Sequence, residues 1–441
     1  MTDTGRLTYR EAVAALTERG RFGISMGLER VERLMAEAGH PERDLRGALV
    51  GGTNGKGSVV AMARSVLAAA GLRVGTMPKP HLVSYRERVA IDGEPLPAAD
   101  FAAAVERVLP AIDRVAAEIG PPTEFEALTA AAITELARRK VDLAIVEVGM
   151  GGRLDATNVL DLGVAAITNV QLDHEAHLGH TLSAIGSEKA PIIKRGNLAV
   201  TGASGRGLRP ILARCAQLGV PLRRAGPRQP YRARVVRSGW DGIVVEARAA
   251  GRRLPDLEVG LLGRHQAQNA AVALALLDAI AERWGVDIPE AALRRGLAEA
   301  RWPGRLEVLD GSRVGLRRVL LDGAHNPAGA LALAVALADL GLRSPTIVFG
   351  AMRAKRVHAV LRALAPLEPR FVFTRVDDPG AHEPVTLARA WRRLSGKRAR
   401  TASTPAEALA LAAGADPVVV AGSLYLVGAV RGMITGSSEE E

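Results

Sequence analysis

The glycine-rich segment GGTNGKGS, Gly51–Ser58, limits the possible folds of this chain more than any other feature. The apolar run Arg46–Gly51 before it is typical of a buried strand, and Ser58–Ala70 after it has helical spacing. Glycines in such a turn let backbone N–H groups point inward around phosphate oxygens, and the helix start adds partial positive charge. Lys56 can reach the outer phosphates, and the Ser58 hydroxyl can hold Mg²⁺. The segment therefore predicts nucleotide binding, although a glycine separates the lysine from the serine and a plain flexible turn is the alternative.

Strand-like and helical segments alternate along the first part of the chain. Continuous apolar runs such as VDLAIVEV are typical of strands buried on both faces of a parallel sheet. The further strand candidates are Leu72–Thr76, Val141–Val148 and Val164–Val170, and the helical ones are Phe101–Ile119 and Glu124–Arg139. This alternation predicts a doubly wound α/β sheet.

The pattern changes after residue 208 and again at the segment RWPGR, Arg301–Arg305. Alternating apolar and polar residues over Arg232–Ala249 predict an antiparallel hairpin, and helices are expected at Gln266–Arg283 and Pro289–Glu299. A second α/β series then has strand candidates at Val319–Asp322, Thr346–Gly350, Phe371–Thr374 and Val418–Ala421. We therefore expect two α/β domains, residues 1–300 and 301–441, with their boundary near Trp302 and a frayed tail at Ser437–Glu441.

Composition narrows the function classes. The net charge is +11, but the arginines are scattered and aromatic residues make up only 3%, so few rings could stack on bases. We therefore expect no nucleic-acid partner, while a positive field favours anionic ligands. The single cysteine, Cys215, suits a reducing compartment. With no apolar signal segment and no run of about 18–20 apolar residues, we expect a cytoplasmic protein without a membrane partner, and a monomer.

Polar and glycine-rich segments follow several of the predicted strands. Glu147 ends the run VDLAIVEV, where a metal ligand or a solvated strand end is expected, and the loop GMGGRLDATN occupies Gly149–Asn158. An Asp–His pair ending at His174 follows the strand ITNV, although a lone histidine is more often structural. DGAHNP at Asp322–Pro327 and GSLYL at Gly422–Leu426 follow strands of the second series. Ligands bind at such strand ends, so we expect one site between the domains.

These motifs, in this order, resemble the folylpolyglutamate synthase/dihydrofolate synthase family of the Mur ligase superfamily. The resemblance runs from about Arg21 to Arg431, through FGISMGLERVERLM, GTNGKGS, YRERV, TEFEALT, VEVGMGGRLDATNV, ITNVQLDH, EKAPIIK, GRHQAQNA, WPGRLE, DGAHNP and GSLYL. It implies an N-terminal domain of the P-loop ATPase type, with a mostly parallel sheet and a small antiparallel β insertion, and a Rossmann-like C-terminal domain. The implied reaction adds L-glutamate to dihydropteroate, to folates or to both, with ATP and Mg²⁺, through an acyl phosphate.

The resemblance also implies roles for individual residues. The ATP-binding set is Gly52, Thr53, Asn54, Gly55, Lys56, Gly57, Ser58, Asn269, Arg305 and Asp322. The metal ligands are Ser58, Glu147, His174 and Lys189 if it is carbamylated, and Lys56, His174 and Lys189 are the catalytic residues. The substrate-binding set is Arg86, Asp155, His325 and Ser423.

Several positions depart from the family pattern. Lys79 stands in KPHL where the family has a serine beside the metal, so its ammonium either points away or takes up a metal position. Pro191 replaces a glycine, Ala354–Arg356 keeps only the lysine of a D-K-D segment, and Pro379–Ala381 lacks the arginine of P-R-A. Two alternatives therefore stay open: a related ligase with another acid acceptor or amino acid, and a non-catalytic nucleotide-binding protein.

Overall fold

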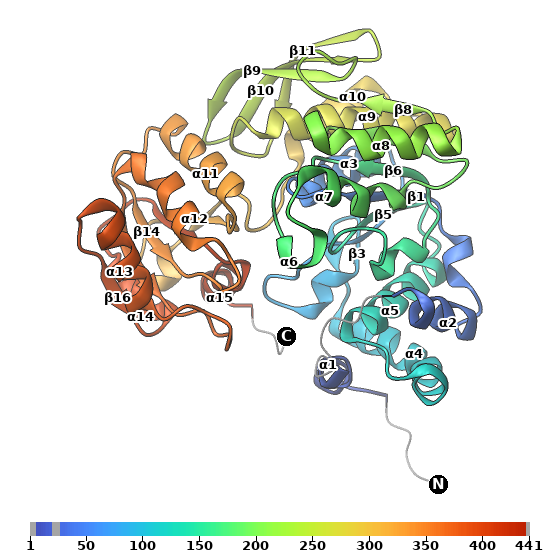
Figure 1. Cartoon of the computed structure of the whole chain (residues 1–441), viewed down its shortest axis with the longest axis horizontal. Helices are drawn as coiled ribbons and strands as arrows, with labels where there is room; N and C mark the ends of the chain where they lie inside the picture. The colour runs from blue at the N-terminus through green and yellow to red at the C-terminus, as the bar shows by residue number, and fades with distance from the viewer. Residues whose placement is uncertain (1–5, 20–26, 438–441) are drawn as a thin grey trace.

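A computed structural model describes residues 6–19 and 27–437 of the chain. Residues 1–5 and the first residues of the segment FGISMGLERVERLM lie outside this described part. The last four residues of the expected frayed tail lie outside it as well. Figure 1 shows two lobes side by side, each built around a sheet, with a smaller sheet at the top of the first lobe. Among the described residues, no helix is both long enough and apolar enough to cross a membrane.

The sheet of the first lobe runs in the order β4-β3-β2-β5-β1-β6-β7-β8. Neighbours from β2 to β8 pair in parallel, and β3 and β4 pair antiparallel. The strands are β1 (Gly47–Gly51), β2 (Val74–Met77), β3 (Ala90–Ile91), β4 (Glu94–Pro95), β5 (Leu143–Glu147), β6 (Gly163–Ile167), β7 (Leu198–Thr201) and β8 (Leu222–Arg224). In this register Val50 lies beside Glu147 on one side and Ala166 on the other, so the ends of these strands meet at one edge.

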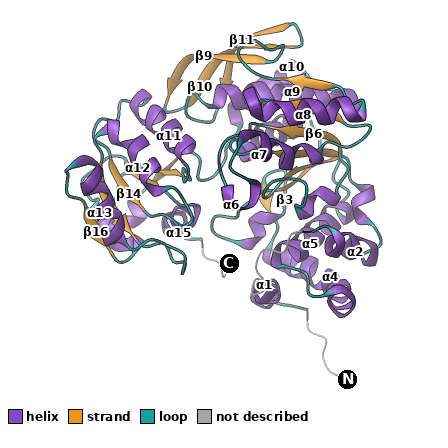
Figure 2. Cartoon of the chain, viewed as in Figure 1, coloured by secondary structure: helices purple, strands orange, loops and turns teal. Residues whose placement is uncertain are grey.

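Helices cover both faces of this sheet, as Figure 2 shows. Side chains of a strand alternate between its faces, so Leu49 joins the core that includes α4 and α5, while Ala48 and Val50 join the core that includes α3 and α9. The helices of this lobe are α1 (Tyr9–Thr17), α2 (Glu29–Glu37), α3 (Lys56–Ala69), α4 (Ala98–Ile119), α5 (Glu124–Arg138), α6 (Glu175–Leu178), α7 (Leu182–Lys189), α8 (Gly205–Leu218), α9 (Gln266–Trp284) and α10 (Glu290–Glu299). Short 3₁₀ turns are η2 (Pro41–Asp44), η3 (Tyr85–Arg88), η4 (Ala156–Val159) and η5 (Ala190–Ile192).

The antiparallel segment predicted over Arg232–Ala249 is present and has one more strand than expected. It consists of β9 (Arg232–Gly239), β10 (Gly242–Ala249) and β11 (Arg252–Val259), in the order β11-β10-β9. Ile243, Val245 and Ala247 are buried against α9, whereas Glu246 is exposed. The hairpin therefore closes one end of the core that α9 shares with the main sheet.

The second lobe has its own sheet, in the order β12-β13-β17-β14-β15-β16. All its neighbours pair in parallel except β12 with β13. The strands are β12 (Glu307–Asp310), β13 (Arg318–Asp322), β14 (Thr346–Phe349), β15 (Arg370–Thr374), β16 (Arg400–Ala402) and β17 (Val418–Ala421). The helices are α11 (Pro327–Asp339), α12 (Val357–Leu364), α13 (Pro384–Ser395), α14 (Pro405–Leu411) and α15 (Leu424–Thr435), with 3₁₀ turns η6 (Ser312–Val314) and η7 (Ala365–Leu367). The predicted α/β class is confirmed for both lobes.

Candidate active site

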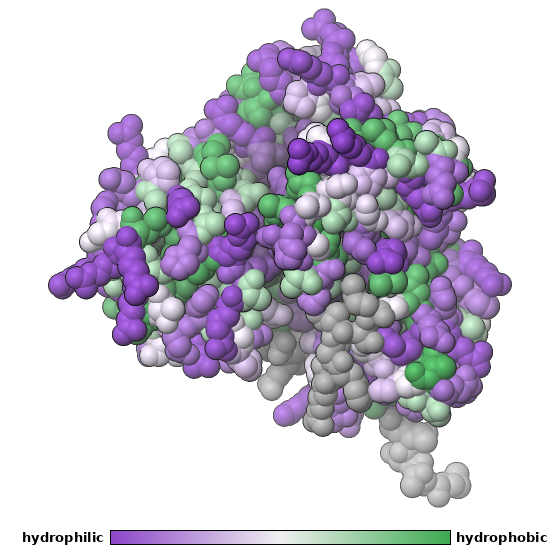
Figure 3. Space-filling model, viewed as in Figure 1, coloured by the Kyte–Doolittle hydropathy of each residue, from purple (hydrophilic) through white to green (hydrophobic). Residues whose placement is uncertain are grey.

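A cavity of about 970 Å³ lies where strand ends of both lobes meet. From the first lobe it is lined by the phosphate-type loop 52–58, by residues 123–126 at the start of α5 and by the loop after β5. From the second lobe it is lined by residues after β13 and after β17. The face of the molecule in Figure 3 is mainly hydrophilic, with hydrophobic side chains in small groups. The cavity between the lobes, with convergent polar groups from both, is therefore the candidate site that we describe.

The loop between β1 and α3 is packed too closely for side chains at two of its glycines. Gly52 and Gly55 have φ values of +139° and +79°, a region that L-residues rarely adopt. A Cβ on Gly52 would lie 1.9 Å from Thr168 Oγ1, and one on Gly55 would lie 2.3 Å from Asn269 Oδ1. The loop leads into α3, which begins at Lys56, two residues earlier than the sequence indicated. The first backbone N–H groups of α3 are therefore available to phosphate oxygens.

Two lysines and one carboxylate converge beside this loop. Lys56 Nζ donates to the carbonyl oxygens of Gly52 at 3.2 Å and Thr53 at 3.3 Å, and lies 3.9 Å from Glu147 Oε1. Lys189, only 3% exposed, also donates to the Gly52 carbonyl, at 3.1 Å. Burial, together with the charge of Lys56, lowers the pKa of Lys189 to about 7. A substantial fraction of the Lys189 side chain is therefore a neutral amine at neutral pH. The neutral amine is the form that could react with CO₂.

The donor set here fits Mg²⁺ better than a metal that needs a full protein cage. Within the described residues no group of three or more His, Cys, Asp and Glu could hold a metal. The cavity is nevertheless lined by two oxygen donors, the carboxylate of Glu147 and the buried hydroxyl of Ser58, which accepts a bond from Gln266 Nε2 at 3.3 Å. Mg²⁺ commonly takes one or two protein oxygens and completes its shell with phosphates and water, so these donors suit a magnesium ion that arrives with a nucleotide.

His174 lies at the start of α6 with a left-handed φ of 49°. Its Nε2 is 4.0 Å from Asp173 Oδ2, and it lines the same cavity. Partial desolvation among the neighbouring side chains, helped by the charge of Lys355, lowers the pKa of the His174 imidazole to about 4, while 44% of the side chain stays exposed. The ring is therefore neutral at physiological pH, which is the form that can bind a metal.

The expected nucleotide residues outside the loop also line the cavity. Asn269 on α9 is buried and donates to Gln266 Oε1 at 2.8 Å. Asp322 ends β13, and its carboxylate accepts the backbone N–H groups of Leu306 at 3.0 Å and Ala324 at 2.9 Å. Burial raises the pKa of Asp322, against the opposing effect of Arg305. Asp322 thus also fixes the segment that carries Arg305 onto the second lobe.

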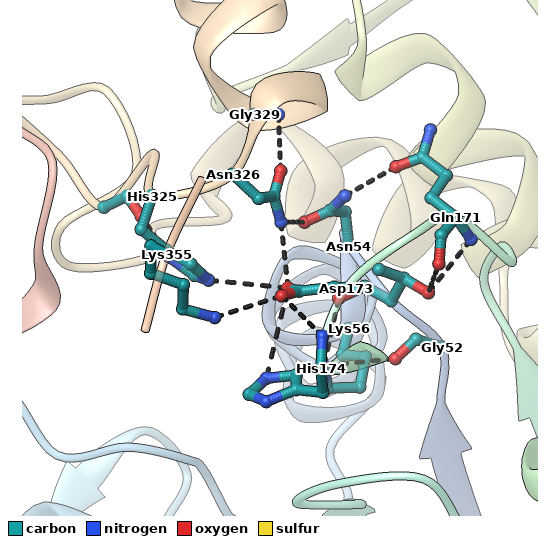
Figure 4. Close-up of polar contacts among 12 residues, drawn as sticks. Gly52, Asn54, Lys56, Gln171, Asp173, His174, His325, Asn326, Gly329 and Lys355 are labelled. Atoms are coloured by element: carbon teal, nitrogen blue, oxygen red, sulfur yellow. Dashed lines mark hydrogen bonds and ion pairs between the residues drawn. The ribbon is translucent and has the colours of Figure 1, made fainter. Parts of the chain in front are cut away.

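A polar cluster joins the two lobes across the cavity, and Asp173 is at its centre (Figure 4). Its carboxylate accepts hydrogen bonds from Lys355 Nζ and Asn326 Nδ2, both at 3.0 Å, and lies 3.7 Å from His325 Nε2. Asn326 Nδ2 also donates to Asn54 Oδ1 of the phosphate loop at 3.1 Å. Burial would raise the pKa of Asp173, but the neighbouring His325 and Lys355 bring it well below its usual range. The sequence reasoning missed Asn326 and gave Lys355 no role.

The expected substrate residues are distributed unevenly around the cavity. Asp155 and His325 line it, as does Ser423, whose hydroxyl accepts the N–H of Tyr425 at 3.2 Å. Arg86 does not line the cavity; its Nε donates to a neighbouring serine hydroxyl at 3.4 Å. Arg88, two residues further along η3, lines the cavity instead.

Comparisons with known proteins decide the family. A model of the Mur ligase middle domain matches residues 50–277, and one of the Mur ligase, glutamate ligase domain matches residues 304–424. A folylpolyglutamate synthase of Lacticaseibacillus casei is 34% identical over 438 residues, which cover 98% of this chain and 99% of that protein. The chain belongs to the folylpolyglutamate synthase/dihydrofolate synthase family of Mur ligases.

Solved structures of this family agree with the fold. The folylpolyglutamate synthase of Mycobacterium tuberculosis complexed with ADP and AMPPCP is similar with a TM-score of 0.86 and 33% identity, over 96% of this chain and 99% of that one. FolC of E. coli in complex with DHPP and ADP is similar with a TM-score of 0.84 and 30% identity, over 96% and 98% of the two chains. The chain has the two-domain Mur ligase fold and is an ATP-dependent amide ligase.

One relative is much longer than this chain. A probable bifunctional folylpolyglutamate synthase/dihydropteroate synthase of Haloferax volcanii is 35% identical, and the chain spans only 50% of its length. The similarity covers 96% of this chain. The chain thus spans about half the length of two of the curated relatives that it matches.

The main departure from the family pattern has a clear position in this ligase. The Lys79 ammonium lies 3.3 Å from the centroid of the Phe125 ring. The backbone N–H of Lys79, not its side chain, faces Glu147, with the N–H donating to Oε2 at 3.5 Å. Burial lowers the pKa of the Lys79 amine to about 8, against the attraction of Asp155. Of the two arrangements considered from the sequence, the structure has the side chain turned toward Phe125.

Proposed function

We propose that this ligase adds L-glutamate to 7,8-dihydropteroate, to folates or to both, through an acyl-phosphate intermediate. The observation that carries the proposal is the convergence of Lys56, Glu147 and Lys189 at one end of a single cavity. Asp155 lies on the first-lobe wall of that cavity and His325 on the second-lobe wall. We assign the two walls to the acceptor acid and to the amino acid, with the nucleotide at the loop.

In the first step an oxygen of the acceptor carboxylate attacks the γ-phosphorus of ATP, and ADP leaves. The loop 52–58 binds the phosphates through backbone N–H groups, and Lys56 stabilises the charge that moves toward ADP. Ser58 and Glu147 would hold Mg²⁺, which when bound neutralises phosphate charge. The polar cluster around Asp173 ties the second lobe to the loop, through Asn326 and Lys355.

In the second step the amine of glutamate attacks the acyl carbon, an amide forms, and phosphate leaves. His325 and Ser423 are the second-lobe residues that we assign to the incoming glutamate, because both line the cavity next to the ends of β13 and β17. Asp155 is assigned to the acceptor. Its location on the wall opposite His325 supports an order in which acid and amine approach from different lobes.

We assign the nucleotide to the loop 52–58, Asn269, Arg305 and Asp322, and the metal to Ser58, Glu147, His174 and a carbamylated Lys189. The low pKa of Lys189 supports its carbamylation, and the neutral imidazole of His174 supports its role as a ligand. We also infer a division into domains at residues 1–300 and 301–441, because the main sheets lie on either side of that point. A cytoplasmic monomer without a nucleic-acid partner completes the proposal, and the single cysteine suits that compartment.

The test is release of ADP by purified protein with ATP, Mg²⁺ and L-glutamate, in the presence of dihydropteroate, tetrahydrofolate or no acceptor. We expect release that depends on at least one pterin acid. Lys56→Ala should abolish it, whereas Lys397→Ala, a change at an exposed lysine that pairs with Glu368 at 3.5 Å, should not. Silence with both pterins, with ADP binding intact, would favour a related ligase for another acid, a second candidate that the substitution at Lys79 supports.

A further inference from the structure

Lys79 and Arg88 form a pair of cations on the cavity wall beside Phe125. Both line the cavity, and Arg88 is only 7% exposed. The Arg88 guanidinium donates through Nε to His81 Nδ1 at 2.9 Å, while its Nη1 is buried and has no hydrogen-bond partner among the described residues. Within the described chain, no carboxylate oxygen lies within 4.0 Å of the side-chain nitrogens of Lys79 or Arg88.

The nearby carboxylates already accept other hydrogen bonds, and Glu124, for example, accepts the hydroxyl of Tyr85 at 2.7 Å. Asp155 accepts the N–H of Met150 at 2.8 Å and both the N–H and the hydroxyl of Thr157, at 3.1 and 2.6 Å. Glu147 faces Lys56 at 3.9 Å and the backbone of Lys79. Buried cations without a carboxylate within ion-pair distance are costly, so a further negative charge at this part of the wall would be favourable.

The position of Lys79 indicates which molecule supplies that charge. Its backbone lies against Glu147, beside the phosphate loop, and its ammonium lies over the Phe125 ring on the cavity wall. A carboxylate that is to attack the terminal phosphate must lie between the loop and the acceptor wall. The phosphates themselves are accounted for by the loop and Lys56.

We propose that Lys79 is a specificity-determining residue, whose ammonium leaves the Phe125 ring to pair with the carboxylate of the acceptor acid, next to the unpaired nitrogen of Arg88. This proposal rests on the proposed function, since it assigns the acceptor to this wall. A charged pair in a partly buried site discriminates strongly between an acid and its neutral analogue, because the analogue leaves the ammonium unpaired. The serine of the family pattern cannot supply that charge.

The test compares binding of 7,8-dihydropteroate with binding of its carboxamide analogue, in the presence of ADP so that no turnover occurs. Dissociation constants are measured by titration calorimetry for the wild type, Lys79→Met, Lys79→Arg and Lys397→Met. We expect the wild type to prefer the acid by about tenfold or more, a size typical of hydrogen bonds to charged groups. Lys79→Met should lose this preference through weaker binding of the acid alone, and Lys79→Arg should keep most of it. Lys397→Met, a matched loss of charge at an exposed lysine outside the cavity, should behave as the wild type does.

The outcomes separate the two proposals. If Lys79→Met weakens the acid and the amide equally, or binds the acid more tightly, Lys79 only packs on Phe125 and the inference is overturned. An unchanged acid preference in Lys79→Met overturns it as well. If the wild type binds ADP but neither pterin, the proposed acceptor class fails and this inference fails with it.

Discussion

The loop that we assign to the phosphates leads into a helix turn that packs against an indole ring, and adding a single methyl group tests that contact. Gly57 lies in the first turn of α3, and a Cβ placed on it would be 2.5 Å from Cε2 and Cζ2 of Trp302 and 2.6 Å from its Nε1. Carbon atoms in favourable contact are about 3.5–4.0 Å apart, so Gly57→Ala creates an overlap of about 1 Å with a rigid ring. Trp302 belongs to the segment RWPGR, which leads into the second lobe.

The size of the effect follows from the cost of overpacking, about 1–3 kcal/mol. Two adjustments can relieve the overlap. The start of α3 can shift, which misplaces the N–H groups that face the phosphates, or Trp302 can move, which displaces Arg305 three residues later. Both weaken nucleotide binding, so we expect the dissociation constant for ADP to rise by about 5- to 150-fold.

Titration calorimetry measures the change in affinity for ADP, and thermal unfolding measures the change in stability. Gly239→Ala is the matched control, because nothing lies within 4 Å of its added Cβ. Removing the ring should relieve the overlap, so Gly57→Ala should cost at least 0.5 kcal/mol less, on the order of a measurable coupling energy, in a Trp302→Ala background. Wild-type affinity for ADP in Gly57→Ala, or an equal cost in both backgrounds, would refute the reasoning.

Three further results are expected. Asp173→Asn removes the charge that ties the lobes together, so kcat/KM for ADP release should fall by about tenfold or more, on the scale of a charged hydrogen bond, with nucleotide affinity little changed. Glu126→Gln breaks a buried pair with Arg30 (2.9 and 3.0 Å) and should lower the unfolding free energy in urea by about 3 kcal/mol, whereas the exposed Glu118→Gln should cost under about 1 kcal/mol. Burial raises the pKa of Cys215 from 9.0 to about 11, so its contribution to stability is present below pH 9 and is lost as pH rises through 11. Iodoacetamide should accordingly modify the native thiol far more slowly than the unfolded one at pH 9.

The sheets were predictable where burial leaves a simple pattern. Strand β5 lies between β2 and β1 with helices on both faces, so its sequence is a continuous apolar run, and the prediction over Val141–Val148 found it. Strand β11 was missed because Arg252–Val259 contains a proline and several exposed charged residues, as an edge strand can. The two-residue strands β3 and β4 are too short to have a period, and only their pairing with β2 defines them.

In the candidate site, too, local features were predictable and contacts between distant residues were not. A loop built from backbone and glycine has a local sequence pattern, so the segment 52–58 could be recognised directly. The cluster around Asp173 joins residues 153 and 182 positions apart, Asn326 and Lys355, and exists only because the lobes meet. For Arg86 and Arg88 the 3₁₀ turn decides which arginine lines the cavity, and the sequence contains no signal for that rotation.

This division also explains why the nucleotide was easier to infer than the acceptor. Every ATP presents the same phosphates. The loop that we assign to them offers backbone groups whose positions depend on glycine conformations such as that of Gly55, so few sequences can serve. The acceptor wall binds with side chains, and a single substitution such as Lys79 changes its charge without disturbing the sheet behind it. Selectivity for the acid can therefore change while the ATP machinery stays the same. On this reasoning the cation pair beside Phe125, not the phosphate loop, determines which acid this ligase accepts.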